Sequence, residues 1–115
     1  MRTLILLVLL LAGTTASANC VRPGAAPAVP DGNTADEATM KVAHDTIQDY
    51  VHSLEAYRAC LVKQVDEATS DTSPELKITW LGQGDAAIDA AQILANSFTV
   101  ALKAFNARQA PAPKK

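Results

Sequence analysis

Two apolar seven-residue repeats, separated by a short polar link, constrain the fold of this 115-residue chain more than any other feature. The first repeat consists of Met40, Ile47, Leu54, Leu61 and Ala68. The second consists of Leu81, Ile88, Ala95 and Leu102. Apolar residues at this spacing fall on one face of a helix. The repeats therefore predict two long helices, over about 35–69 and 74–108.

The link between the two helices, at about 70–73, is short enough to force an antiparallel arrangement. The predicted fold class is therefore all-α, an antiparallel two-helix hairpin of the coiled-coil type that spans 34–108. Counting outward from the link predicts four apolar contacts, which are Leu61 with Leu81, Leu54 with Ile88, Ile47 with Ala95, and Met40 with Leu102. Additional rows, Ala91-Phe98-Phe105 and Ala87-Leu94-Ala101, widen the apolar face of the second helix.

The helix starts carry capping signals. Thr34 followed by Glu37 fits a capping box for the first helix, and Thr72 or Ser73 can cap the second. Inside the second helix, Gly82 and Gly84 each weaken helix formation by about 1 kcal/mol relative to alanine. A break that lets the helix restart near Asp85 is the alternative, but we expect a continuous helix whose missing side chains leave room for Tyr57 or Trp80.

Residues 1–18 have the pattern of a signal peptide, with Arg2, an apolar run over 4–12 and Ala16-Ser17-Ala18 before the cleavage point. Nine apolar residues form only ~14 Å of helix, against the ~30 Å thickness of a bilayer core. We expect a periplasmic or secreted protein with no membrane span after signal removal. Lipid attachment at Cys20 is the alternative, although Asn19 breaks the lipoprotein pattern.

Export favours a disulfide between Cys20 and Cys60, because small domains in oxidising compartments use cysteine pairs in this way. Three prolines make 19–33 an extended arm. An arm from Cys20 to Thr34 spans ~43 Å, and a helix from Thr34 to Cys60 spans ~39 Å. The arm can therefore lie back along the first helix. Residues 109–115 are predicted to form a flexible tail.

Charge and shape exclude several function classes. Without Arg2 the net charge is −3, which gives no basic face for nucleic acid and no attraction to anionic lipid. A rod of two helices offers no deep concave site and no evident nucleophile, so we expect no enzymatic activity and no cofactor. The run Gly82-Gln83-Gly84 superficially fits a dinucleotide-binding loop, but that loop needs a parallel sheet.

Asp45, Asp49 and His52 share one face of the first helix and form the only candidate metal site. We interpret them as a solvated helix face, since no further ligand stands nearby in the sequence. His44 borders the apolar seam, and we expect it to be packed or half-exposed.

The second helix also carries an outer apolar row, Ala86, Ile93, Val100 and Ala107. A hairpin cannot bury both this row and the inner seam, so the arm, a second copy or another protein has to cover Ile93 and Val100. We expect a homodimer that forms a four-helix bundle. The alternative is a set of scattered surface residues.

A resemblance rests on residues along most of the mature chain: Cys20 to Pro23, Val29-Pro30-Asp31-Gly32, Ala35, Met40, Tyr50, Tyr57, Cys60-Leu61, Ala87-Ile88-Asp89, Phe98 and Leu102. The pattern resembles a group of small exported proteobacterial proteins of unknown function. The resemblance implies a location in the bacterial envelope and a helical hairpin, and it implies no activity. Gln83-Gly84 departs from the polar or aromatic pair of that group.

These observations predict a non-catalytic interaction or structural module of the bacterial envelope. The alternatives are a small periplasmic chaperone-like protein that clamps apolar segments and a metal-binding protein that uses Asp45, Asp49 and His52.

Overall fold

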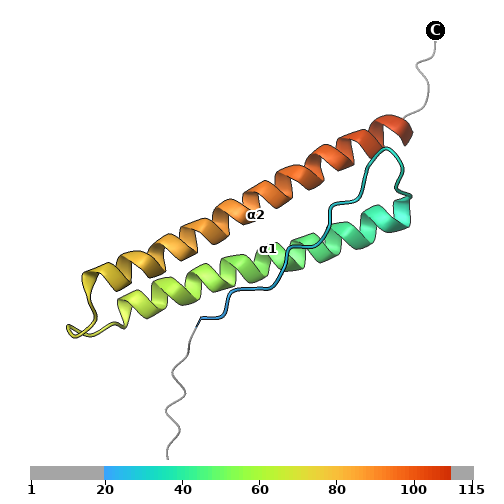
Figure 1. Ribbon diagram of the computed structural model, residues 1–115. Coiled ribbons are helices and arrows are strands. Elements are labelled where there is room, and N and C mark those ends of the chain that lie inside the picture. Colours follow the sequence, from blue (N-terminus) through green and yellow to red (C-terminus); the bar gives the residue numbers. More distant parts are fainter. Residues whose placement is uncertain (1–19, 110–115) are drawn as a thin grey trace, which may run out of the picture.

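The computed structural model describes residues 20–109, which form two helices and an extended N-terminal arm. Helix α1 (Glu37–Asp66) and helix α2 (Pro74–Gln109) lie side by side and antiparallel, and the part of the chain described contains no strand (Figure 1). The predicted all-α hairpin is thus confirmed. The predicted signal peptide and the tail beyond Gln109 lie outside the described residues.

Helix α1 begins later than predicted, because Thr34 is not its cap. The backbone N–H groups of Thr34 and Ala35 donate to the carbonyl of Asp31, at 3.1 and 2.8 Å, and form a turn ahead of the helix. Asp36 takes the capping position, where its carboxylate accepts from the Thr39 backbone N–H at 2.8 Å. The capping box from Thr34 to Glu37 was therefore a wrong prediction, since the Asp31 turn occupies that part of the chain.

Helix α2 begins as predicted and passes through both glycines without a break. The Ser73 hydroxyl oxygen accepts from the Leu76 backbone N–H at 3.2 Å, which satisfies one free donor of the first turn. A Cβ on Gly84 would lie 3.0 Å from Cγ of Arg58, whereas a Cβ on Gly82 would meet nothing within 4 Å. The space at Gly84 is thus taken by Arg58, and the prediction that it serves Tyr57 or Trp80 was wrong.

The seam between the helices buries the first four residues of the predicted row of α1 but a different row of α2. The fifth residue, Ala68, lies beyond the end of α1 at Asp66, three residues before the predicted end, and is half-buried. Met40, Ile47, Leu54 and Leu61 are at most 4% exposed. On α2 the buried residues are Gly84, Ala87, Ala91, Leu94, Phe98 and Ala101. Leu81 and Leu102 are 41% and 37% exposed, so the row of α2 chosen for the four predicted contacts lies at the edge of the seam.

The size of the side chains explains this rotation of α2. Alanines on the buried row let the two backbones approach closely, and the ring of Phe98 enters the core with Met40 and Ile47. Burial of a phenylalanine stabilises more than burial of Ala95 would. The seven-residue spacing is the same in every row of α2, so spacing alone did not distinguish them.

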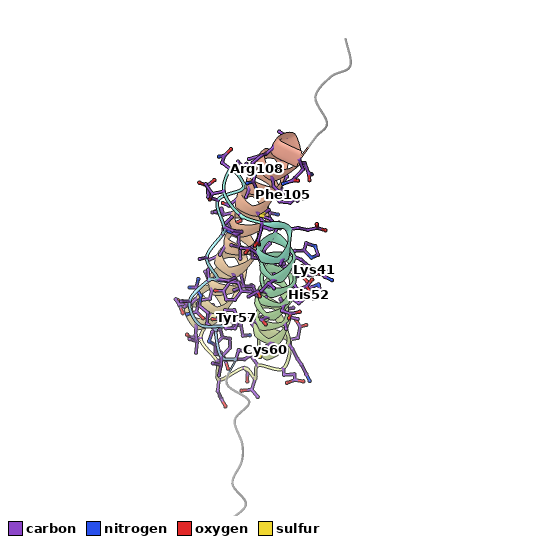
Figure 2. All side chains as sticks on the ribbon, turned by 90° about the vertical axis from the view of Figure 1, so that its right-hand side faces the viewer. Lys41, His52, Tyr57, Cys60, Phe105 and Arg108 are labelled. Carbon is purple, nitrogen blue, oxygen red and sulfur yellow. A yellow bond between two sulfur atoms is a disulfide. The ribbon has the colours of Figure 1, made fainter. Side chains whose placement is uncertain are left out.

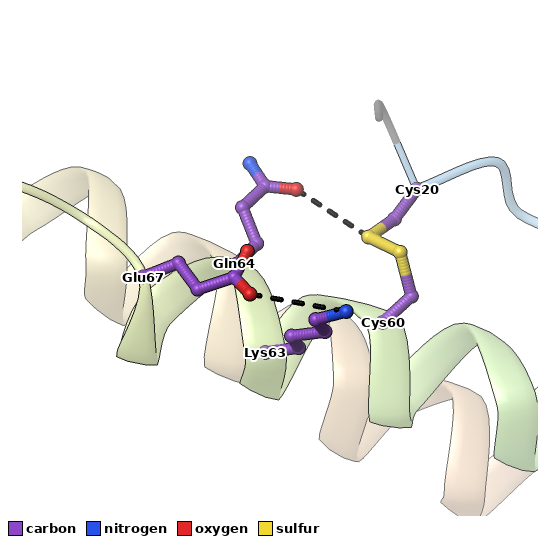
Figure 3. Close-up of a disulfide and its surroundings, with 5 residues drawn as sticks. All are labelled: Cys20, Cys60, Lys63, Gln64 and Glu67. Carbon is purple, nitrogen blue, oxygen red and sulfur yellow. Dashed lines mark hydrogen bonds and ion pairs between the residues drawn. A yellow bond between two sulfur atoms is a disulfide. The ribbon is translucent and has the colours of Figure 1, made fainter. Parts of the chain in front are cut away.

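The arm runs back over α1 as a third layer (Figure 1). Cys60 and Cys20 form a disulfide with a Cα–Cα distance of 5.7 Å, which confirms the predicted pair (Figure 3). Along the arm, the Tyr50 hydroxyl donates to the Gly24 carbonyl at 2.7 Å, and Val29 packs on the core. At the turn, Gly32 is buried against the backbone of α2.

Candidate interaction surface

The outer row of α2 contains two large apolar side chains, Ile93 and Val100, that the hairpin does not bury. Ile93 is 67% exposed and Val100 is 68% exposed, one helical repeat apart. Ala86 and Ala107, at the two ends of the predicted outer row, are exposed as well. The structure thus places all four residues of this row on one surface without a covering element in the described part of the chain.

The arm is not the element that covers this face. It is held over α1 by the disulfide at Cys60 and by the hydrogen bond from Tyr50. At its other end, Arg108 donates to the carbonyl of Ala35, and the guanidinium of Arg108 lies 5.5 Å from the ring centre of Phe105 (Figure 2). The sequence left the arm, a second copy or another protein to cover Ile93 and Val100. The position of the arm excludes the first of these.

Sequence reasoning did not single out the polar residues that flank the outer row. Asp89, Asn96 and Lys103 are exposed and follow one edge of the row at seven-residue spacing. The same seven-residue count that found the apolar row finds them, but polar residues were interpreted only as solvated surface. Their order along α2 gives this edge an acidic residue, Asp89, toward its N-terminal end and a basic residue, Lys103, toward its C-terminal end.

The three metal candidates lie on the exposed outer side of α1. Figure 2 shows His52 on the same side as Lys41. Asp45 lies beside the neighbouring His44 instead, with 3.2 Å between Nδ1 and Oδ1. In residues 20–109 no three His, Cys, Asp or Glu side chains come together in a way that could hold a metal ion.

His44 reaches the edge of the seam. Its ring centre lies 5.8 Å from that of Phe98 in a tilted arrangement, while its side chain remains 56% exposed. The ring therefore covers the core phenylalanine from outside, in agreement with the half-exposed position that we expected.

A shallow groove of about 590 Å³ opens near the link end of the hairpin. Its lining combines Val62, Ala59 and Ile88 with charged side chains, among them Arg58 and Glu55. Arg58 reaches across from α1 to α2, where its Nε lies 3.8 Å from the Asp85 carboxylate. No polar or charged side chain of the described chain is buried, and the charged side chains that line the groove are exposed.

The surroundings of the disulfide are polar and exposed on one side. The Gln64 side-chain oxygen lies 3.4 Å from Sγ of Cys20, and Lys63 forms an ion pair with Glu67 at 3.8 Å (Figure 3). The bridge ties the start of the arm at Cys20 to α1 at Cys60.

Neither α1 nor α2 contains an apolar stretch that is long enough to cross a membrane. No protein-family model, curated protein or solved structure is significantly similar to the chain.

Proposed function

We propose that this chain is an exported, non-catalytic helical-hairpin protein of the bacterial envelope that binds another polypeptide through the outer face of α2. That polypeptide is a second copy or a different envelope protein. The observation that carries the proposal is the exposure of Ile93 and Val100, at 67% and 68%, on a helix whose inner face is already buried. An exposed apolar face of this kind is typical of an interaction site.

The location in the envelope is supported by two observations. The N-terminal 18 residues have the signal-peptide pattern, and a disulfide closes a loop with a sequence separation of 40. Disulfides of this kind persist in oxidising compartments such as the periplasm. A reporter fused to residues 1–30 should be secreted. Mass spectrometry of the native protein should give the mass of a chain that begins at Asn19.

The test of the binding face is the double variant Ile93→Lys/Val100→Lys. Two ammonium groups on this face should abolish the association of the mature protein with its partner, because burial of unpaired charge is strongly unfavourable. Sedimentation velocity of the purified protein and affinity capture from native envelope are the measurements. The matched control is Val21→Lys/Val42→Lys, which adds the same charge at side chains that are 81% and 66% exposed.

The proposal fails if the double variant associates as the wild-type chain does. It also fails if the wild-type chain is monomeric in solution and captures no protein from the envelope. A partner of the wild-type chain should also be captured by the control variant. Circular dichroism should show unchanged helix content for both variants, since every substituted residue is exposed.

A chaperone-like function is the second candidate, and one observation favours it. Near the link, Leu76, Ile78 and Leu81 are 42%, 69% and 41% exposed on the first two turns of α2. Ile78 and Leu81, three residues apart, share one face of α2 and offer an apolar pair that can hold an apolar segment of an unfolded client. The test is suppression of client aggregation at near-stoichiometric amounts, which Ile78→Lys/Leu81→Lys should remove while Ile93→Lys/Val100→Lys leaves it intact.

A further inference from the structure

The outer face of α2 continues beyond Ile93 and Val100 as a complete helix-pairing stripe. Its members alternate four and three residues apart and are Ala86, Ala90, Ile93, Ser97, Val100, Ala104 and Ala107. This spacing is the one that two packed helices share. All are exposed except Ala90 and Ala104, which are half-buried. We call this set the outer stripe.

The outer stripe has a fixed relation to the seam with α1. Ala90, Ile93 and Val100 each stand one residue before a buried residue of the seam. One residue turns an α-helix by about 100°, so α2 has two apolar faces at nearly a right angle. A helix in a four-helix bundle contacts its two neighbours at about this angle. The hairpin therefore has the shape of half of such a bundle.

Charge along one edge of the outer stripe is self-complementary. Asp89 and Lys103 each lie seven residues from Asn96, on opposite sides of it, and all three are exposed. If two α2 helices run antiparallel about a two-fold axis at Asn96, each Asp89 faces the Lys103 of the other copy. The same axis places each Ile93 beside the other copy's Val100. An interface with two-fold symmetry needs this kind of self-complementarity.

A parallel pair would not use these charges. In a parallel pair the edge with Asp89 and Lys103 would face the opposite edge of the partner's stripe. That edge consists of Ala87, Leu94 and Ala101, which are at most 8% exposed because they pack against α1. The charges would then have no partner across the interface, so the pattern selects the antiparallel arrangement.

We propose that a second copy of this chain covers the outer stripe, with the two α2 helices antiparallel about a two-fold axis at Asn96. In each half of this interface the Asp89 carboxylate pairs with the Lys103 ammonium group of the other copy. Four helices, two from each copy, then form one bundle. This inference rests on the proposed function, since it names the partner that binds the outer face of α2.

Charge reversal tests the arrangement. Asp89→Lys and Lys103→Asp each replace two attractive pairs by two repulsive ones, so each single variant should raise the dimer dissociation constant about tenfold. The double variant Asp89→Lys/Lys103→Asp restores both pairs and should return to within about threefold of wild type. Asp45→Lys, at an exposed position of α1, is the control and should leave the dissociation constant unchanged.

A mixture of the two single variants gives a sharper readout. In an antiparallel pair of Asp89→Lys with Lys103→Asp, both charge pairs are attractive. The heterodimer should therefore form at concentrations at which each single variant alone is monomeric. Native mass spectrometry distinguishes the heterodimer by mass, and sedimentation equilibrium gives the dissociation constants. Added salt should weaken the wild-type dimer and strengthen each single-variant dimer.

The inference is overturned if the wild-type chain is monomeric up to submillimolar concentration, or if the mixture associates no better than the single variants. The proposed function still holds in that case if the wild-type protein captures another partner and Ile93→Lys/Val100→Lys does not. The proposed function itself is contradicted if Ile93→Lys/Val100→Lys changes no association of the protein.

Discussion

Gly32 occupies the point at which the arm turns against the C-terminal half of α2. A Cβ at this position would overlap the carbonyl oxygen of Ala101 and would lie 3.0 Å from the backbone nitrogen of Phe105. Both are backbone atoms of a helix, so they have little freedom to move aside. The absence of a side chain is therefore what allows the turn at Asp31 to rest directly on α2.

Gly32→Ala should destabilise the fold by about 1–3 kcal/mol, the usual cost of forcing an extra methyl group into a packed site. Chemical denaturation of the oxidised protein measures this change. Gly24→Ala is the matched control in the same arm, because a Cβ there meets nothing within 4 Å. Equal stability of the two variants would show that the turn does not rest on α2.

The capping residue Asp36 gives the fold a dependence on acid pH. The Thr39 side chain, and then the Thr39 backbone N–H, hold the pKa of Asp36 below its ordinary value of 3.8. A carboxylate with a depressed pKa in the folded state stabilises the fold fully above the unfolded value, and this contribution disappears as the pH falls through the folded value.

Asp36→Asn should therefore keep a capping oxygen but reduce the loss of stability below about pH 4. Melting temperatures measured from neutral pH down to about pH 2 test this difference. Asp31→Asn serves as a comparison in the preceding turn. If the wild-type and Asp36→Asn curves stay parallel over the whole range, the cap does not contribute to the acid response.

At the scale of the element, α2 shows both what its sequence predicted and what it did not. Its bounds followed from the repeat, the Ser73 cap and Pro74. Its rotation did not follow, because apolar residues occur nearly all round the helix and every row has the same spacing. The choice of buried row depended on how Phe98 packs with Met40 and Ile47, which is a property of the two helices together.

The two helical glycines provide a prediction for this element. Gly82→Ala should stabilise the protein by about 1 kcal/mol, since it removes the helix penalty of glycine in open space. Gly84→Ala should gain less or lose, because its Cβ would lie 3.0 Å from Cγ of Arg58 and that side chain would have to move. Thermal unfolding compares the two variants, and a larger gain at Gly84 would contradict the role of Arg58.

At the scale of the whole molecule, the path of the arm could be predicted because only distances along the chain were needed. The lengths of the arm and of α1 already brought Cys20 to Cys60, and the structure closes that bridge. The outer surface was predicted only in part. The repeat identified Ile93 and Val100, whereas the flanking charges gained meaning only once the buried face of α2 was known.

Removal of the bridge should weaken the whole fold. Closure of a loop of this length stabilises by about 4 kcal/mol in the chain-entropy estimate. Reduction, or Cys20→Ser/Cys60→Ser, should lower the denaturation midpoint accordingly and make the arm sensitive to proteases before the helices. The double variant should not respond to reductant, which separates the effect of the bridge from other effects of the reagent.

The bridge also fixes where the arm begins relative to the end of α2. Cys20 is fixed near the link end of the hairpin, whereas Gln109 ends α2 at the opposite end (Figure 1). The intervening helix keeps the two exits roughly 40 Å apart. Two domains fused at these positions would be held at a fixed spacing by the hairpin. A reducing agent would free the arm from α1, so the domain attached ahead of the arm would lose its fixed position while remaining attached to the chain.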